Sequence, residues 1–202
     1  MVRAIKIISP EQFNAIPWKN GKGITEELAI SDGDSMNSFD WRLSIASVDE
    51  DGVFSDFSGY QRNLILLSGN GIELRHQWLP SETISFDVLD DILSFATFNG
   101  CWKTLGLLNN GPISDFNVMH NTEKFEARVE ISKNHQDLTL AQADFCFIYP
   151  LTEEASLTSF DGSVDIIVKP GHLLQILSND DNSAQLQLSG ANLIVIYLQC
   201  LK

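Results

Sequence analysis

The chain has 202 residues, with 27 acidic side chains against 13 lysines and arginines, and its formal net charge is −14. This excess of acid argues against a protein that binds nucleic acid or an anionic membrane surface, because both need clustered cations. The length allows one large domain or two small ones.

The three cysteines, Cys101, Cys146 and Cys200, lie far apart and have no C-x-x-C spacing. They predict neither a disulfide framework nor a zinc site, and they favour a reducing compartment. Residues 1–10 lack the charged-then-apolar order of a signal peptide, and no apolar run reaches about 18 residues. We therefore expect a cytoplasmic protein.

The first element that the sequence predicts is one short N-terminal helix, which begins at Ser9. Ser9 can cap this helix, Pro10 suits its first position, and Gln12 lies where it completes a capping box. Pro17 ends it, because a proline cannot continue a helix.

Nearly all of the remaining chain is predicted to form short strands. Apolar runs, several of them alternating with polar residues, cover residues 41–48, 61–68, 72–78, 113–119, 125–131, 144–151, 164–168, 173–177 and 192–201. Gly69-Asn70-Gly71 between two of these runs predicts a hairpin. Many short strands at this spacing indicate a sandwich or barrel, and the polar segment Asn121–Lys124 is a reasonable seam between two halves.

The loop after the expected helix is the most unusual segment of the chain. Gly21 and Gly23 let backbone amides point into a concavity that can hold an anionic or carbonyl oxygen. Lys19 adds a charge, and Asn20 adds both a donor and an acceptor. The alternative is a tight surface turn packed by Trp18.

Two of the five arginines lie in predicted strands. Arg42 shares a strand face with the small residues Ser44 and Ala46, so it would point into a cavity if that face lined a barrel. Arg62 lies in the strand before the glycine turn. A guanidinium grips a carboxylate through two hydrogen bonds. The alternative for each arginine is an internal ion pair with one of the many acids.

A third polar group occurs in the strand predicted over residues 113–119, where Asp115, Asn117 and Met119 share one face. Asp and Asn are poor strand formers. A solvated face would explain them trivially. On an inward face they must hydrogen-bond something, and a ligand is a candidate.

Several catalytic and metal-binding patterns do not occur in the sequence. The four histidines have no H-x-H or H-E-x-x-H spacing, so we expect no metal and no cofactor. The sequence also contains no G-x-S-x-G elbow, and we assign no catalytic residue.

Four motifs follow one another over most of the first 120 residues. They are P-W-K-N-G-x-G from residue 17, F-D-W-R-L-S-I-A from residue 39, Arg62 followed by L-L-x-G-x-G from residue 66, and G-P-x-x-D-F-N-V-M from residue 111. Together they resemble the HutD/Ves family. The last third of the chain contributes only its general strand pattern to this resemblance.

The resemblance implies an all-β bicupin fold, in which two jelly-roll-type β-barrels occupy residues 1–120 and 121–202 of one compact chain. A strand from the N-terminus would be exchanged into the second barrel. The resemblance further implies a metal-free protein of histidine utilisation or stress response, and an N-formylglutamate-like acid as ligand of the histidine-utilisation branch. Its pocket positions, to which the glycine pair adds Gly23, correspond to Lys19, Asn20, Gly21, Arg42, Arg62, Asp115 and Asn117.

Two positions depart from the family pattern. Lys22 stands where a third glycine is usual, and it either adds an anion contact or is solvated. Glu26 stands where a basic residue usually precedes the acid, here Glu27, and it makes the loop less positive. The Ves-like branch, which has no settled ligand, therefore stays open.

We predict a small-molecule binding protein in which Arg42 and Arg62 neutralise carboxylates, the loop at 19–23 binds a carbonyl or second anion, and Asp115 with Asn117 binds an amide. Two alternatives stay open: a metal-independent isomerase or hydrolase that uses Asp115 as its base, and an acidic module that binds a basic protein. The expected partner is a small acidic metabolite, not nucleic acid or a membrane, and a homodimer is an assembly that the sequence leaves open.

Overall fold

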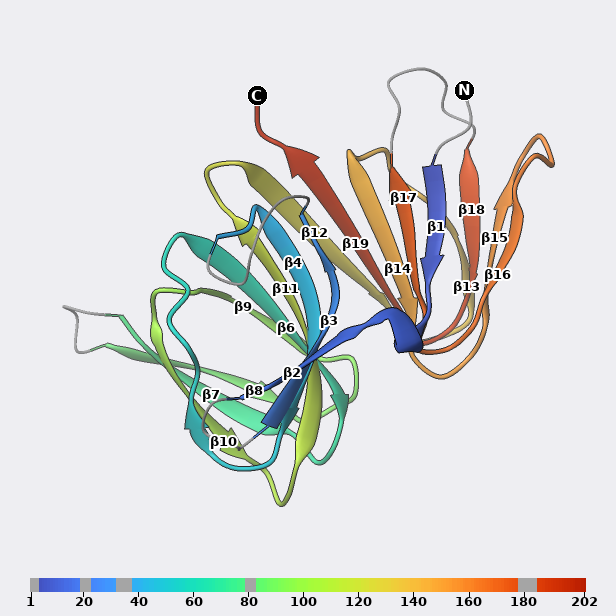
Figure 1. Cartoon of the computed structure of the whole chain (residues 1–202). Coiled ribbons are helices and arrows are strands. Elements are labelled where there is room, and N and C mark those ends of the chain that lie inside the picture. The colour runs from blue at the N-terminus through green and yellow to red at the C-terminus, as the bar shows by residue number, and fades with distance from the viewer. Residues whose placement is uncertain (1–3, 19–22, 32–37, 79–82, 178–184) are drawn as a thin grey trace. The chain divides into compact units, whose positions relative to one another are not determined.

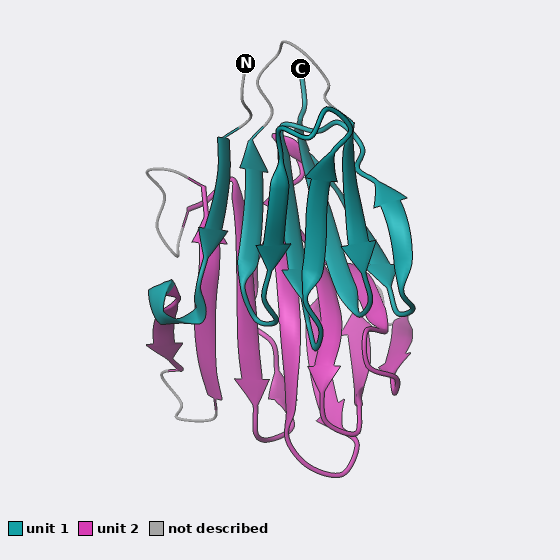
Figure 2. Cartoon of the chain, turned by 90° about the vertical axis from the view of Figure 1, so that its right-hand side faces the viewer, with its two compact units in different colours: residues 1–12, 126–202 teal, residues 13–125 magenta. Residues whose placement is uncertain are grey.

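The structure is a computed structural model that describes residues 4–18, 23–31, 38–78, 83–177 and 185–202. These residues form nineteen strands and one short 3-10 helix (Figure 1). The strands belong to two compact units, which have different colours in Figure 2. Unit 1 comprises residues 1–12 and 126–202, and unit 2 comprises residues 13–125. Each unit contains two sheets, and the expected all-β fold of two jelly-roll-type barrels is confirmed.

Unit 2 contains a six-stranded and a four-stranded antiparallel sheet. The six-stranded sheet has the order β2 (Asn14–Pro17), β3 (Gly23–Ile30), β4 (Trp41–Val48), β11 (Ile113–Asn121), β6 (Tyr60–Ser68) and β9 (Phe95–Asn99). The four-stranded sheet has the order β5 (Gly52–Val53), β10 (Lys103–Leu108), β7 (Ile72–Gln77) and β8 (Ile84–Leu89).

Unit 1 contains a five-stranded and a second four-stranded sheet. The five-stranded sheet has the order β1 (Ala4–Ile8), β17 (Leu173–Leu177), β14 (Phe145–Pro150), β19 (Leu193–Cys200) and β12 (Phe125–Ser132). The four-stranded sheet has the order β13 (Gln136–Thr139), β18 (Leu186–Gly190), β15 (Ala155–Ser159) and β16 (Asp165–Val168). Because β1 pairs with β17, this unit takes its first strand from the beginning of the chain.

The predicted N-terminal helix is wrong. Ser9 and Gln12 do form the expected capping contact, in which the Ser9 amide donates to Gln12 Oε1 at 3.0 Å. The turn stops there, and only the 3-10 helix η1 (Pro10–Gln12) forms. The next residues pair with β3 as strand β2, because a ladder along a sheet satisfies more backbone groups than one further helical turn. No helix among the described residues is long and apolar enough to cross a bilayer.

The hairpin predicted at Gly69-Asn70-Gly71 is also wrong, although the turn itself exists. Gly69 and Gly71 have φ values of +95° and +113°, which a glycine adopts without strain. The strands on either side belong to different sheets, since β6 pairs with β11 and β9 whereas β7 pairs with β10 and β8. The turn therefore carries the chain from one sheet of unit 2 to the other.

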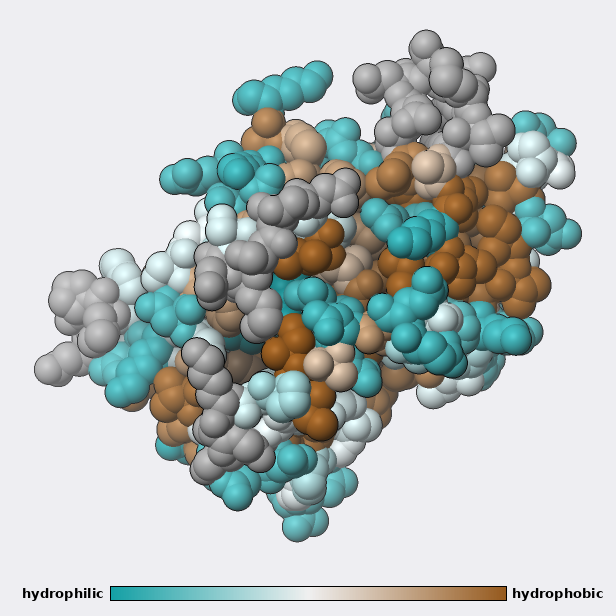
Figure 3. Space-filling model, viewed as in Figure 1, coloured by the Kyte–Doolittle hydropathy of each residue, from teal (hydrophilic) through white to brown (hydrophobic). Residues whose placement is uncertain are grey.

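The interiors of the two units differ in polarity. The core of unit 1 is formed by aliphatic side chains together with Cys146 and Tyr197, and hydrophobic residues gather over this unit on the right of Figure 3. The core of unit 2 also contains charged groups. Among the described residues, the buried arginine and aspartate side chains all lie in unit 2, and they are Arg42, Arg62 and Asp115. A buried charge is costly unless it is paired, and these buried charges make unit 2 the place of the candidate functional site.

Candidate functional site

The inward face of the six-stranded sheet of unit 2 carries the polar residues in rows. The register of β4, β11 and β6 defines three rows, which are Arg42–Met119–Arg62, Ser44–Asn117–Leu64 and Ala46–Asp115–Leu66. Strands lie about 4.8 Å apart, so the backbones of the two arginines are roughly 10 Å apart, with the Met119 strand between them. The sheet thus brings together Arg42, Arg62 and the pair Asp115 and Asn117, which come from three strands far apart in sequence.

A cavity of about 750 Å³ lies over these rows. Three of the residues predicted from the sequence line it, namely Arg42, Arg62 and Asn117. Asp115 and Gly23 do not line it. Most of the other lining residues are apolar or small. The complete set of these other residues is Ile16, Pro17, Trp18, Thr25, Ser44, Ala46, Val48, Glu50, Asp51, Gly52, Val53, Phe54, Ser55, Phe57, Gly106 and Met119.

The predicted loop residues Lys19, Asn20 and Gly21, and the departure at Lys22, lie outside the described residues. The structure describes Gly23 as the first residue of β3. A Cβ atom there would collide with the carbonyl oxygen of Ser47 and would lie 3.1 Å from the Trp18 ring. Among the described residues, Gly23 therefore lets its own backbone lie close to the Ser47 carbonyl group and the Trp18 ring.

Arg42 pairs with an acid through one side of its guanidinium and has a nitrogen left over on the other. Its Nε donates to Glu27 Oε2 at 2.7 Å, and the side chains are only 4% and 13% exposed. The internal ion pair that the sequence offered as the alternative for this arginine is therefore present. One terminal nitrogen, Nη2, is buried without a hydrogen-bond partner among the described residues. Because Arg42 lines the cavity, this nitrogen is available to an anion that enters.

Arg62 lies within a group of aromatic rings. Its guanidinium carbon is 5.1 Å from the ring centroid of Phe54, 5.5 Å from that of Phe57 and 5.2 Å from that of Phe98. Such contacts stabilise a cation that has lost its water. Nη2 donates to Asn117 Oδ1 at 2.7 Å, whereas Nε is buried without a partner in the described part of the chain. Burial lowers the pKa of Arg62 to about 10, so the guanidinium stays protonated at neutral pH.

Asp115 is fully buried and connects to Arg62 through Asn117. The Asn117 side-chain amide donates to Asp115 Oδ1, while Asp115 Oδ2 has no partner among the residues that the structure describes. Burial raises the pKa of Asp115 to about 7, and the positive charge of Arg62 and the hydrogen bond from Asn117 limit that rise. The carboxyl group is therefore close to half-protonated at neutral pH.

Two β-bulges adjoin the two acids of this site. The pairing of β11 with β6 shifts register between Ser114 and Asp115, and the pairing of β3 with β4 shifts between Glu27 and Ala29. A bulge adds one residue to one strand and changes the direction of nearby side chains. Both shifts lie in the six-stranded sheet next to residues that face the arginines.

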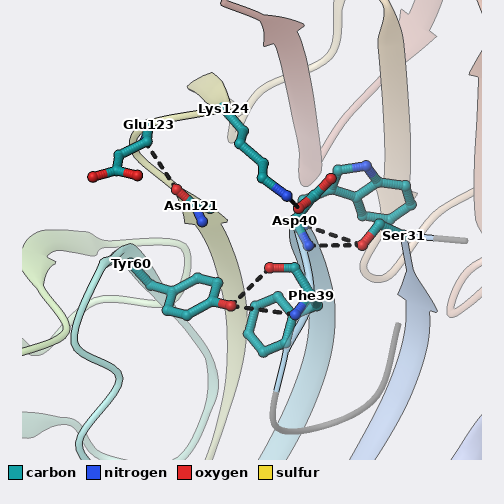
Figure 4. A network of polar contacts seen from close by, with 8 residues as sticks. Ser31, Phe39, Asp40, Tyr60, Asn121, Glu123 and Lys124 are labelled. Carbon is teal, nitrogen blue, oxygen red and sulfur yellow. Dashed lines mark hydrogen bonds and ion pairs between the residues drawn. The ribbon is translucent and has the colours of Figure 1, made fainter. Parts of the chain in front are cut away.

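A network of polar contacts holds the end of the sheet beside the arginine row (Figure 4). The Tyr60 hydroxyl donates to the Phe39 carbonyl at 2.7 Å and accepts from the Phe39 amide at 3.2 Å. Asp40 forms an ion pair with Lys124, and its carbonyl accepts from the Asn121 amide at 2.8 Å. Because Asp40, Tyr60 and Asn121 each lie two positions from a member of the row Arg42–Met119–Arg62, the network fixes the backbone from which that row projects.

Sequence reasoning missed several of the residues that complete the site. Glu27 could have been found, because it alternates with Thr25 along β3 and so shares its inward face. For Trp18 the sequence predicted only that it packs against a turn. In the structure its indole nitrogen donates to Thr25 Oγ1 at 2.7 Å. Phe54, Phe57 and Phe98 carried no signal, because they approach Arg62 from segments separate in sequence.

Gly106 offers a test of the aromatic group. A Cβ atom at this position on β10 would lie 2.6 Å from the Phe54 ring and 2.9 Å from Ile72. We expect Gly106→Ala to displace Phe54 and to lower the free energy of unfolding by about 1–3 kcal/mol, which a urea titration measures. Gly52→Ala is the matched control, since Gly52 pairs with Gly106 across β5 and β10 and has open space around its own Cβ position. Equal stability of the two variants would contradict the expectation.

Comparison with known proteins agrees with the four sequence motifs. A family model described as HutD matches residues 10–196. An uncharacterized 21.2 kDa protein in the hutC 3′ region of Pseudomonas putida is 36% identical over 127 residues, which are 62% of this chain and 63% of that protein. Protein Ves of Escherichia fergusonii is 36% identical over 117 residues, which are 57% of each chain. The chain thus matches less than two thirds of the length of these curated relatives.

The structural comparison extends over nearly the whole chain. The structure of HutD from Pseudomonas fluorescens SBW25 (formate condition) superposes with a TM-score of 0.80 at 26% identity, covering 98% of this chain and 100% of that one. Since the family model also covers residues 10–196, the chain belongs to the HutD family.

Proposed function

We propose that the cavity of unit 2 binds a small organic acid, and that the protein acts in the cytoplasm as an accessory or regulatory binding protein of histidine utilisation. The observation that carries this proposal is that two buried arginines, Arg42 and Arg62, line one cavity and each have a nitrogen with no partner among the described residues. A buried donor without a partner costs free energy, and an entering carboxylate can satisfy it.

An acid with two polar ends suits this arrangement. The guanidinium groups come from backbones roughly 10 Å apart, so separate oxygens of one compact molecule can reach both. Asn117 lines the cavity next to Arg62 and can bind an amide or formyl group. An N-formylglutamate-like acid has these groups, and the relative in the hutC region of Pseudomonas putida supports the metabolic context.

Isothermal titration with N-formylglutamate tests the proposal. We expect heat from N-formylglutamate and other small diacids, and none from the corresponding neutral diamide, because the amide lacks the charge that the arginines neutralise. The diamide is the matched control for size and shape. Equal heats from acid and diamide, or no heat from any acid, would overturn the proposal.

A metal-independent isomerase or hydrolase is the second candidate, and the pKa of Asp115 favours it. A carboxyl group with a pKa of about 7 suits a general base at neutral pH. Asp115 does not line the cavity, however, and its contact with Asn117 turns one oxygen toward the protein. Prolonged incubation of N-formylglutamate with concentrated protein, followed by NMR, distinguishes the candidates, since only an enzyme changes the ligand chemically.

A further inference from the structure

Two arginines of the cavity wall, Arg42 and Arg62, each have a carboxyl group close by. Glu27 bonds to Arg42 Nε, and the Asn117 side chain joins Asp115 to Arg62. These four groups sum to zero when Asp115 is ionised, and two further acids between β4 and β5 also line the cavity. An arriving carboxylate therefore adds negative charge to a cluster that has no excess of positive charge.

The other titratable groups around the cluster are few. From the four-stranded sheet, β7 contributes His76, whose ring is held between Thr104 Oγ1 at 2.9 Å and Asp87 Oδ2 at 3.0 Å. Glu50 and Asp51, between β4 and β5, line the cavity, and Asp51 accepts a hydrogen bond from the Leu108 amide. The described residues of β9 that face inward, Ala96 and Phe98, do not titrate.

Of the two acids in the cluster, Asp115 is the one that can be protonated more easily. Its side chain lies among apolar residues of the unit 2 core, with Ala46 and Leu66 beside it on the neighbouring strands. Its Oδ2 atom is buried and has no partner in the described residues, so a proton can be added there without breaking a contact. Asn117 continues to donate to Oδ1 when the group is neutral.

We propose that a carboxylate ligand enters this cavity together with one proton, which Asp115 takes up from solvent. The ligand binds as the anion and none of its bonds changes, while the Asp115 carboxylate becomes a neutral carboxylic acid at Oδ2. This inference rests on the proposed function, because it needs an acid that binds beside Arg62.

The electrostatics of the free protein support the direction of this coupling. Arg62 is the charge that holds the pKa of Asp115 down against burial. A ligand carboxylate on Arg62 offsets that charge, so the pKa of Asp115 rises above about 7 on binding. Linkage then requires the affinity to fall up to tenfold for each pH unit above 7, and to be nearly constant below pH 6.

Isothermal titration measures how many protons the complex takes up when N-formylglutamate binds. The titration is run at pH 5.5 and at pH 8, each time in two buffers with different heats of ionisation, such as phosphate and Tris. We expect a clear net uptake of protons at pH 8, up to one for each ligand bound, and close to none at pH 5.5. Asp115→Asn should bind with no proton uptake and with an affinity that does not change over this range. Asp137→Asn is the matched control: it makes the same exchange at an exposed acid on β13, outside the cavity, and should retain the uptake at pH 8.

The outcomes separate the two proposals. Binding by wild type without proton uptake at pH 8, or uptake that persists in Asp115→Asn, overturns the proton coupling and leaves the acid-binding proposal intact. Binding of no acid at either pH overturns both. If Asp115→Asn does not fold, carbon-13 NMR of the Asp115 carboxyl in wild type decides. We expect its titration midpoint to rise when N-formylglutamate is added, and an unchanged midpoint would contradict the coupling.

Discussion

Replacement of Arg62 by alanine is expected to weaken the binding of N-formylglutamate by about thirtyfold or more. Removing one partner of a buried charge pair costs about 2–5 kcal/mol, and each 1.4 kcal/mol is a tenfold change in affinity. Arg62 is fully buried, lines the cavity and has an Nε without a partner in the described part of the chain, so water cannot replace it as a counter-charge. The ratio of dissociation constants from isothermal titration measures the effect.

The three rings around Arg62 make the choice of variants important. Arg62→Ala leaves a void among Phe54, Phe57 and Phe98, so a second variant, Arg62→Met, fills the space without charge. Both should lose binding, and circular dichroism should show both folded. Arg75→Ala is the matched control, because Arg75 is half-exposed, pairs with Glu73 and lies outside the cavity lining. Wild-type affinity in Arg62→Met would contradict the acid-binding proposal.

Replacement of Asp115 by asparagine is expected to make the stability of the protein less dependent on pH. A carboxyl whose pKa is raised on folding stabilises the folded state at low pH, and this contribution is lost as the pH rises through the folded value. For Asp115 the pKa goes from 3.8 to about 7, which corresponds to about 4 kcal/mol over the whole range. Between pH 5 and pH 8 we expect the free energy of unfolding of wild type to fall by about 2–3 kcal/mol through this group. The asparagine variant should not show this fall.

Thermal unfolding at several pH values measures this difference. About 1 kcal/mol changes Tm by 2–4 °C in a chain of this size. The Tm of the variant relative to that of wild type should therefore rise by several degrees between pH 5 and pH 8. Asp137→Asn, at an exposed position on β13, is a control that should follow wild type. Parallel curves for wild type and Asp115→Asn would show that Asp115 ionises as freely in the folded protein as in the unfolded chain.

The sequence predicted the central strands of unit 2 well, because the alternation of side chains that defines a strand is visible within a short stretch of sequence. Residues 41–48 form a strand with the predicted bounds, and Asp115, Asn117 and Met119 share one face of β11 as predicted. The sequence left open whether this face is solvated, and in the structure it is buried. Period-two alternation places alternate side chains on one face, so knowing which face is inward places Arg42 without any further information. The prediction that these residues bind a ligand has no such local basis and stays a prediction.

Other features could not be predicted because they depend on distant partners. The capping signal at Ser9 and Gln12 was genuine, yet pairing of the next residues with β3 prevailed over it. The turn at Gly69 to Gly71 has the backbone that its sequence requires, but which strands it joins is set by the sheets. The three rings around Arg62 come from two segments, Phe54 and Phe57 from the loop before β6 and Phe98 from β9, and no spacing rule connects these segments.

The two register shifts beside the acids separate two kinds of length change in this sheet. Each bulged strand has one extra residue, Leu28 in β3 and Leu67 in β6. Deleting either leucine would make its ladder regular and keep the later side chains on their faces, with loss of the local bend. Deleting a paired residue of β4 or β11 would instead shift the register by one and turn the later side chains to the other face. Insertions and deletions among homologues should therefore collect in the connecting loops and at the two bulges, and avoid β4 and β11.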